Sequence, residues 1–143
     1  MSAEDDVRAA SVQFYAALNR MLNGDTTPLA AIWSHGAGVT AMHPVGGRDL
    51  GWTDVRSSWE KVASVASEGN VTLSDQLIQV AGDMAYEVGT ERGSVKLAGQ
   101  PVSGINHRVT NVYRRETGGW KIVHHHTDLS QPMLEVLSRL RSD

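Results

Sequence analysis

The sequence predicts an α+β fold in which N-terminal helices are followed by a curved antiparallel sheet. Apolar residues recur every three or four positions in the first part of the chain, as on an amphipathic helix, and every second position from residue 71 onward, as on a strand. Glycine-containing turns separate the alternating runs, which is typical of an antiparallel meander. A bent sheet wrapped around helices forms a cone with an internal cavity.

Helices are expected before the sheet and again at its end. The first closes at the Asn-Gly pair of residues 23–24, where glycine can adopt a left-handed C-cap. A short second helix begins at Pro28, a third ends near residues 69–70, and a terminal helix follows Pro132. The apolar stripes that predict them are Val7, Ala10, Phe14, Leu18, Met21 and Leu22, then Leu29, Ala31 and Ile32, then Val55, Trp59, Val62 and Ala66, and last Met133, Val136, Leu137 and Leu140.

Strands are expected wherever the period is two. A short extended run at residues 39–43 ends in the Pro-Val-Gly-Gly turn of residues 44–47. Long strands are predicted at residues 71–80, 85–97, 102–115 and 120–129. The turns between them contain Gly82, Gly99 and the Gly-Gly pair at 118–119.

Length and composition limit the classes of protein to consider. A chain of 143 residues is predicted to be one domain, 1–143, which can bury roughly 70% of its unfolded surface. The chain has no cysteine and an acidic N-terminus without an apolar leader segment, so we expect a cytoplasmic protein. No apolar run approaches the length of a membrane span, and a net charge of -3 without a basic cluster argues against nucleic acid. The expected partner is a small molecule or another protein.

Residues 118–128, which read Gly-Gly-Trp-Lys-Ile-Val-His-His-His-Thr-Asp, are the most informative segment of the chain. The Gly-Gly turn predicts a hairpin whose second strand begins at Trp120. At period two, Trp120, Ile122, His124 and His126 share one face. That face would pass from an apolar core into surroundings polar enough for imidazoles, as the floor of a pocket does.

Several motifs together resemble a known superfamily. They are Val-Gln-Phe-Tyr-Ala-Ala-Leu-Asn at 12–19, Asn-Gly-Asp at 23–25, His-Pro-Val-Gly at 43–46, Gly51 with Val55-Arg56, and the hairpin at 118–126. In this order and spacing the chain resembles the nuclear transport factor 2-like (NTF2-like) superfamily, and within it the branch of ketosteroid isomerase, SnoaL-like polyketide cyclases and DUF4440. The resemblance implies a cone-shaped α+β barrel, a fold that serves isomerases, cyclases, dehydratases and dehydrochlorinases as well as binding and assembly domains.

The resemblance also implies candidate catalytic residues. His43 stands where the isomerases carry a carboxylate general base, directly before Pro-Val-Gly, and imidazole is largely neutral near pH 7 and can accept a proton. Tyr15 resembles the tyrosine that donates to the oxyanion. Asn111 takes the place of the protonated acid that completes the oxyanion hole; an amide can donate a hydrogen bond but cannot release a proton. With base and acid both changed, steroid isomerisation is not expected.

Further residues are expected to line the pocket and bind the substrate. Counting back from the Gly-Gly turn places Val109 and Tyr113 on the inward face with Asn111, and His124, His126 and Asp128 opposite them. Trp59 belongs to a set of tryptophans that would suit a flat apolar ligand. An alternative is that the histidines are a hydrogen-bonded feature of the fold, and that Trp59 and Tyr113 belong to the core. His107 and Arg108 are expected at solvent or at an interface.

A metal site is an alternative role for the histidines. His124 and His126 would lie about 6.6 Å apart by backbone rise, and His43 or Asp128 could supply a third ligand. The relatives that the chain resembles generally work without metal, so no metal and no cofactor are expected.

The resulting hypothesis is a homodimer that binds a small, largely apolar, carbonyl-bearing molecule. As an enzyme it would abstract a proton next to the carbonyl, with an isomerase, cyclase or lyase outcome. The alternative is a non-catalytic ligand-binding or oligomerisation domain. The dimer is expected to form through the outward face of the long strands, which Thr110 and Val112 leave only partly polar.

Overall fold

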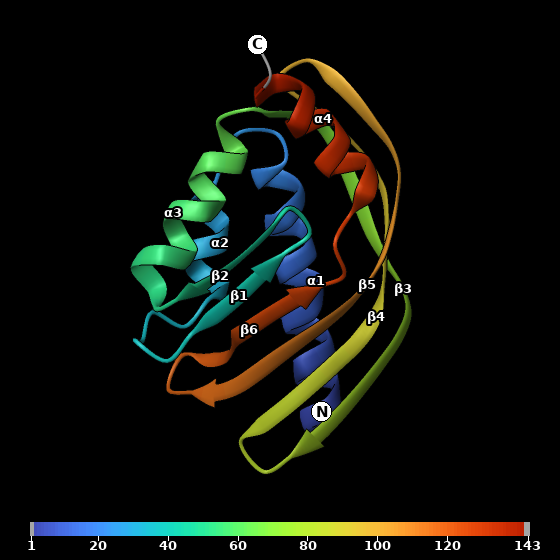
Figure 1. The fold of residues 1–143 in the computed structure, drawn as a ribbon. Helices are drawn as coiled ribbons and strands as arrows, with labels where there is room; N and C mark the ends of the chain where they lie inside the picture. Colours follow the sequence, from blue (N-terminus) through green and yellow to red (C-terminus); the bar gives the residue numbers. More distant parts are fainter. Residues whose placement is uncertain (1, 142–143) are drawn as a thin grey trace.

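The computed structural model describes residues 2–141, with only the backbone of residues 103 and 141, and folds into a curved sheet around helices (Figure 1). Residues 1 and 142–143 of the predicted domain lie outside the described part. The elements are α1 (Ala3–Met21), α2 (Thr27–Ile32), β1 (Thr40–His43), β2 (Gly46–Leu50), α3 (Trp52–Ala63), β3 (Ala66–Ala81), β4 (Met84–Leu97), β5 (Gln100–Glu116), β6 (Gly119–Thr127) and α4 (Gln131–Arg141).

The strands form one sheet in the order β2-β1-β6-β5-β4-β3. Neighbours are antiparallel except β1 and β6, which run parallel, so that Thr40 pairs with His124 and Ala41 with His125. The sheet is curved but not closed into a barrel, because β2 and β3 form its two edges. The predicted α+β class, with a curved sheet wrapped around N-terminal helices, is confirmed.

Irregularities in β3 and β4 bend the long hairpin. The pairing of β3 with β4 shifts in register twice, and Glu68 and Asp75 within these shifts have φ angles of 51° and 57°. At Gly93 the strands approach so closely that a Cβ atom would lie 1.9 Å from the carbonyl oxygen of Asn70. β-Bulges and close backbone approach at glycine are the usual means by which a sheet curves.

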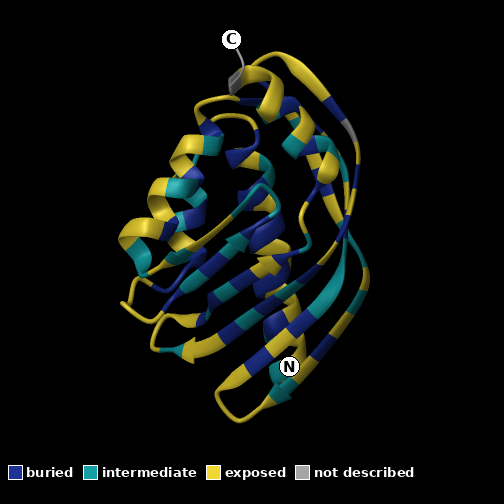
Figure 2. Ribbon diagram, in the orientation of Figure 1, coloured by how far each residue is buried: buried dark blue, intermediate teal, exposed yellow. Residues whose placement is uncertain are grey.

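The core lies between α1 and the concave face of the sheet (Figure 2). α1 begins with a capping box in which Ser2 and Asp5 satisfy each other's backbone N–H groups. It buries a stripe headed by Val7 and Phe14, which have no exposed surface. Among the described residues, no helix is long and apolar enough to cross a membrane.

Two boundaries differ from the sequence prediction. α3 ends at Ala63, and residues 66–70 belong to β3, because the turn after Ala63 does not need the glycine at position 69. The segment expected to be only a turn after His43 continues into β2, which pairs back onto β1 from Gly46 to Leu50. This extra hairpin brings Asp49 next to His43.

Candidate functional site

A cavity of about 70 Å³ lies inside the cone, between α1, α3, α4 and the concave face of the sheet. α4 covers one end of it, and the backbone N–H of Ser130 ties the segment before α4 to the carbonyl oxygen of Pro44, 2.8 Å away. Most of the lining is aliphatic, with Trp59 as its largest side chain. The polar side chains of the lining are His43, Glu91, His107 and His125.

His43 lies where the sequence predicted it, at the end of β1 and on the wall of the cavity. Its side chain is 7% exposed and packs edge-on against Trp59, with ring centroids 4.9 Å apart. Its Nε2 lies 2.7 Å from a carboxylate oxygen of Asp49 on β2. A carboxylate on Nε2 holds the proton there, so that Nδ1 carries the lone pair of the neutral ring.

The predicted inward orientation of His124 and His126 is wrong, because β6 contains a bulge. Tyr113 pairs with Ile122, but the next residue of β5, Val112, pairs with His124, so one extra residue sits in β6. This insertion reverses the alternation that begins at Trp120. His125, rather than its neighbours, faces inward, where it is 1% exposed.

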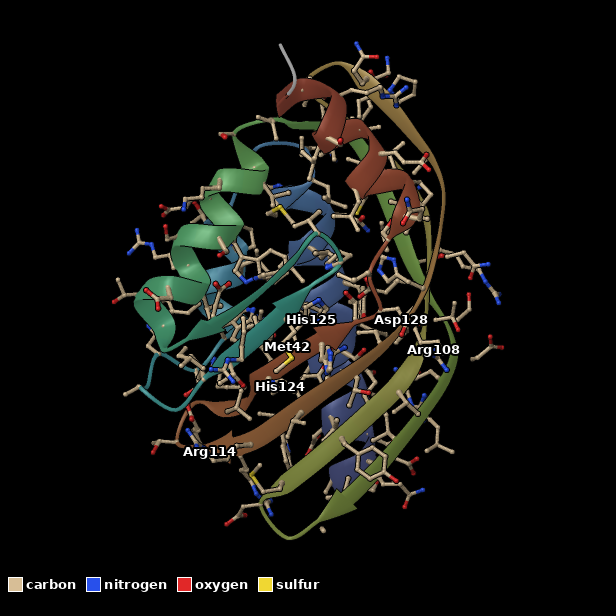
Figure 3. The ribbon with its side chains drawn as sticks, in the orientation of Figure 1. Met42, Arg108, Arg114, His124, His125 and Asp128 are labelled. Carbon is tan, nitrogen blue, oxygen red and sulfur yellow. The ribbon has the colours of Figure 1, made fainter. Side chains whose placement is uncertain are left out.

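His124 and Asp128 lie on the outer side of the sheet (Figure 3). His126 is exposed beside His124, with ring centroids 5.8 Å apart. His124 Nδ1 is 2.6 Å from the Thr40 hydroxyl, and burial together with the neighbouring His126 lowers its pKa. Asp128 accepts two hydrogen bonds from the guanidinium of Arg108, at 2.8 and 3.2 Å, which lower the pKa of the carboxyl group. Within residues 2–141, no group of three or more His, Cys, Asp or Glu side chains is arranged to hold a metal ion.

Glu91 on β4 organises the polar side of the cavity. It is fully buried and accepts hydrogen bonds from His107 Nε2, at 2.8 Å, and from the Tyr15 hydroxyl, also at 2.8 Å. His107 was expected at solvent or at an interface, and that prediction is wrong. It pairs with Glu91 across the β4–β5 ladder and therefore points inward with it.

A second buried carboxylate, Glu87, lies four residues before Glu91 on β4 and points to the same side of the sheet. Its Oε1 accepts from Asn111 Nδ2 at 2.9 Å and from the Tyr113 hydroxyl at 3.0 Å, and its Oε2 accepts from Gln76 at 2.7 Å. Asn111 Nδ2 also donates to the Tyr15 oxygen, 3.1 Å away, and its Oδ1 accepts from His125 Nδ1 at 2.6 Å. Tyr15, Asn111 and Tyr113 are thus brought together, but behind the lining of the cavity rather than on it.

The electrostatics of this cluster follow from its burial. Burial lowers the pKa of His125 to about 4, against the attraction of Glu91, so its ring is neutral at pH 7. Burial alone would raise the pKa of Glu91, but the hydrogen bond from His107 and the nearby imidazoles outweigh it and lower the pKa, so Glu91 is ionised. Burial and the two carboxylates raise the pKa of Tyr15 and of Tyr113, which keeps both hydroxyls protonated.

Two polar atoms of the lining residues have no partner within the described chain. They are Nδ1 of His107 and Nε1 of Trp59, both fully enclosed. A buried polar atom without a hydrogen bond costs about 1–3 kcal/mol and therefore calls for an explanation. A bound molecule or water that supplies the missing partner is a direct one.

Sequence reasoning missed four residues of this cluster: Glu87, Glu91, His107 and His125. A signal for the two glutamates was present, because they occupy inward positions of β4 in phase with the buried Ala85. Charged residues at the positions of a long strand that should face the core indicate either an edge strand of the sheet or a functional site. His125 had no such signal, since the bulge is not visible in the sequence.

These features define an α+β domain with a largely apolar cavity on the concave face of its sheet. The chain belongs to the SnoaL-like domain family, whose profile matches residues 7–133. Comparison with curated proteins finds no match.

Solved structures share the fold. A candidate dehydratase of the NTF2-like family from Streptomyces avermitilis is 28% identical, with a TM-score of 0.78 over 89% of this chain and 95% of that one. A candidate calcium/calmodulin-dependent protein kinase type II association domain from Thiobacillus denitrificans is 25% identical, with a TM-score of 0.69 over 87% and 94%. An NTF2-like superfamily protein from Salmonella enterica, 17% identical with a TM-score of 0.78 over 90% and 92%, is similar in fold.

Proposed function

We propose that this protein is a cofactor-free acid–base enzyme that removes a proton next to the carbonyl group of a small, largely apolar molecule. One observation carries the proposal: three imidazoles, of His43, His107 and His125, line a largely apolar cavity, and each has one ring nitrogen held by a hydrogen-bond partner. Oriented imidazoles in a water-poor site are the usual groups for proton transfer near pH 7. This is the chemistry that the resemblance to the ketosteroid isomerase branch implies.

His43 is the proposed base. Asp49 fixes its ring through Nε2, leaves Nδ1 to accept the substrate proton, and would stabilise the imidazolium that results. The apolar lining around Trp59 would hold the body of the substrate and keep water out.

The proposed proton donor is His107. Because its Nε2 donates to the ionised Glu91, it would donate to the substrate from Nδ1 as an imidazolium. Tyr15 and Asn111 were the expected oxyanion donors; their hydrogen bonds are already made to Glu91 and Glu87, so we assign them a positioning role behind His107 and His125.

With His43 as base and His107 as acid in one cavity, the proposed reaction is an elimination catalysed by a lyase. Removal of the α-proton by the base, with departure of a β-hydroxyl that takes a proton from the acid, yields an α,β-unsaturated carbonyl compound and water. The name of the Streptomyces avermitilis neighbour, a candidate dehydratase 28% identical to this chain, supports this outcome. Reprotonation at another carbon would give an isomerase instead.

The second candidate function is a non-catalytic ligand-binding or oligomerisation domain. The likeness to the candidate association domain from Thiobacillus denitrificans favours it. On the outer face of β4, Met84 and Tyr86 are 41% and 45% exposed, and such a face would suit a homodimer.

Hydrogen–deuterium exchange at the α-carbon of simple ketones tests the proposal without knowledge of the substrate. Cyclohexanone in D₂O, followed by proton NMR, should lose its α-protons faster with the protein than with buffer. His43→Ala should remove most of this acceleration, whereas Glu60→Gln, on the exposed face of α3, should retain it. If no ketone that binds exchanges faster, or if His43→Ala exchanges as fast as the wild type, the binding-domain alternative is favoured.

A further inference from the structure

The chain of buried hydrogen bonds behind His125 determines which of its ring nitrogens is free. Glu87 is a carboxylate that accepts three hydrogen bonds, and it can accept from Asn111 only through the amide nitrogen Nδ2. The amide oxygen of Asn111 must then point at His125 Nδ1, 2.6 Å away. Tyr15 agrees with this orientation, because its hydroxyl donates to Glu91 and its oxygen accepts from Asn111.

His125 therefore carries its proton on Nδ1. The hydrogen bond to Asn111 Oδ1 requires a donor at that nitrogen, and the second nitrogen of the neutral ring, Nε2, holds a lone pair. Within the described residues no hydrogen-bond partner of Nε2 is found, and the ring lines the cavity beside Trp59, with centroids 5.6 Å apart. The cavity thus contains a fixed hydrogen-bond acceptor, which needs a donor on the ligand.

The charge of the lining restricts the ligand further. Glu91 is buried on the cavity wall and is kept ionised by its hydrogen bonds. Among the described residues, no lysine or arginine side chain lines the cavity. An anion bound here would lose its hydration beside a buried carboxylate that already takes up the hydrogen bond of His107, and no lysine or arginine of the described lining would compensate its charge, which is a large cost.

We infer that the cavity takes an uncharged hydroxy-carbonyl compound, whose hydroxyl group donates a hydrogen bond to Nε2 of His125. Carboxylates of the same size are excluded by Glu91. The inference deepens the proposed function, because it concerns the ligand of the same cavity, but it is tested by binding rather than by turnover. Asn111 and Glu87 act in it as positioning residues, since they fix the tautomer of the ring that touches the ligand.

Three cyclic probes of similar size separate the contribution of the hydroxyl group from the effect of a negative charge. 3-Hydroxycyclohexanone carries both groups, cyclohexanone lacks the hydroxyl, and 3-oxocyclohexanecarboxylate replaces it by an anion. Titration followed by NMR of ¹⁵N-labelled imidazoles should show the hydroxy ketone binding about tenfold tighter than cyclohexanone, as expected for one hydrogen bond in an enclosed site. The hydroxy ketone should also change the chemical shift of His125 Nε2. The carboxylate should bind more weakly than either of the other two probes.

Variants of His125 and Glu91 test whether these two residues cause the preference for the hydroxyl group and the weak binding of the carboxylate. His125→Asn can still donate to Asn111 from the position of Nδ1 but has no atom at Nε2, so it should bind the hydroxy ketone and cyclohexanone equally. His125→Gln places an amide oxygen near the position of Nε2 and should restore part of the preference. Glu91→Gln should narrow the gap between the carboxylate and the hydroxy ketone, whereas the exposed control His35→Asn should change nothing.

Several results would overturn the inference. They are equal binding of cyclohexanone and the hydroxy ketone by the wild type, tight binding of the carboxylate, no binding of the hydroxy ketone at all, or a hydroxyl preference that survives in His125→Asn. A hydroxyl preference without any proton exchange dependent on His43 would instead refute the proposed function and leave this inference in place. The two failures are therefore distinguishable.

Discussion

The buried, neutral ring of His125 makes the stability of this protein depend on pH in a window that can be calculated. Its pKa is 6.5 ordinarily and about 4 in the folded chain, because burial disfavours the charged form. Between these values the unfolded chain binds a proton that the folded chain does not. The free energy of unfolding must therefore fall as the pH is lowered from about 6.5 toward 4.

The magnitude follows from the two pKa values. Each unit of difference corresponds to about 1.4 kcal/mol, so the full effect of His125 approaches about 3 kcal/mol at pH 4. By pH 5 about 2 kcal/mol should already be lost. A domain of this size has a total stability of about 5–15 kcal/mol, so the loss is a measurable fraction of it. Glu91 contributes at lower pH, because its folded pKa lies below its ordinary value of 4.5 and its stabilising effect is lost as the pH falls through that range.

Urea unfolding at pH 7, 6 and 5, followed by circular dichroism, measures this dependence. His125→Asn removes the titrating group but can keep a donor to Asn111, so it should be less stable than the wild type at pH 7. The difference in unfolding free energy between the two proteins should shrink by about 2 kcal/mol at pH 5. His35→Asn, at an exposed histidine, is the matched control and should follow the wild type. A difference for His125→Asn that stays constant from pH 7 to pH 5 would refute the reasoning.

Three further outcomes are expected. His43→Ala should lower the rate of the reaction or exchange about a hundredfold to ten-thousandfold, and at least as much as Asn111→Ala, which removes a residue that only positions His125, with the fold of His43→Ala intact by circular dichroism; near-wild-type turnover in His43→Ala would contradict it. Light scattering at micromolar concentration should give the mass of a dimer that associates through the outer face of β4 and β5, and a monomer mass would remove that prediction. Elemental analysis of protein purified without an affinity tag should find no stoichiometric transition metal; one zinc, iron or nickel ion per chain, lost when His124 and His126 become alanine, would support the metal site instead.

The fold could be predicted from the sequence because each element carries its own periodic signal. The stripe from Val7 to Leu22 and the alternation in β3 to β6 are local patterns, and both were found within a few residues of their bounds. β2 was missed because Gly46 and Gly47 indicate a turn and the strand after them has no buried alternation. Its pairing with β1 is a tertiary interaction that overrides the local composition.

The candidate site was predicted less completely, because it depends on pairing between strands. His43 was found from a short motif that also fixes its place at a strand end. Asp49, which orients it, lies on the strand that was missed. The partners of Tyr15 and Asn111 lie 76 and 24 residues away along the chain, and such contacts are fixed by register rather than by sequence spacing.

Because of the bulge in β6, more than one residue of the histidine triplet can supply the imidazole that faces Asn111. In the observed register His125 lies opposite Asn111; if the strand ran without the bulge, the same position would be filled by His124. Either arrangement therefore presents an imidazole to the same amide. A mutation or folding error that removes the bulge would cost packing at Val123, but an imidazole would still face Asn111. The repeated histidine therefore preserves this hydrogen-bond partner when the strand shifts by one residue.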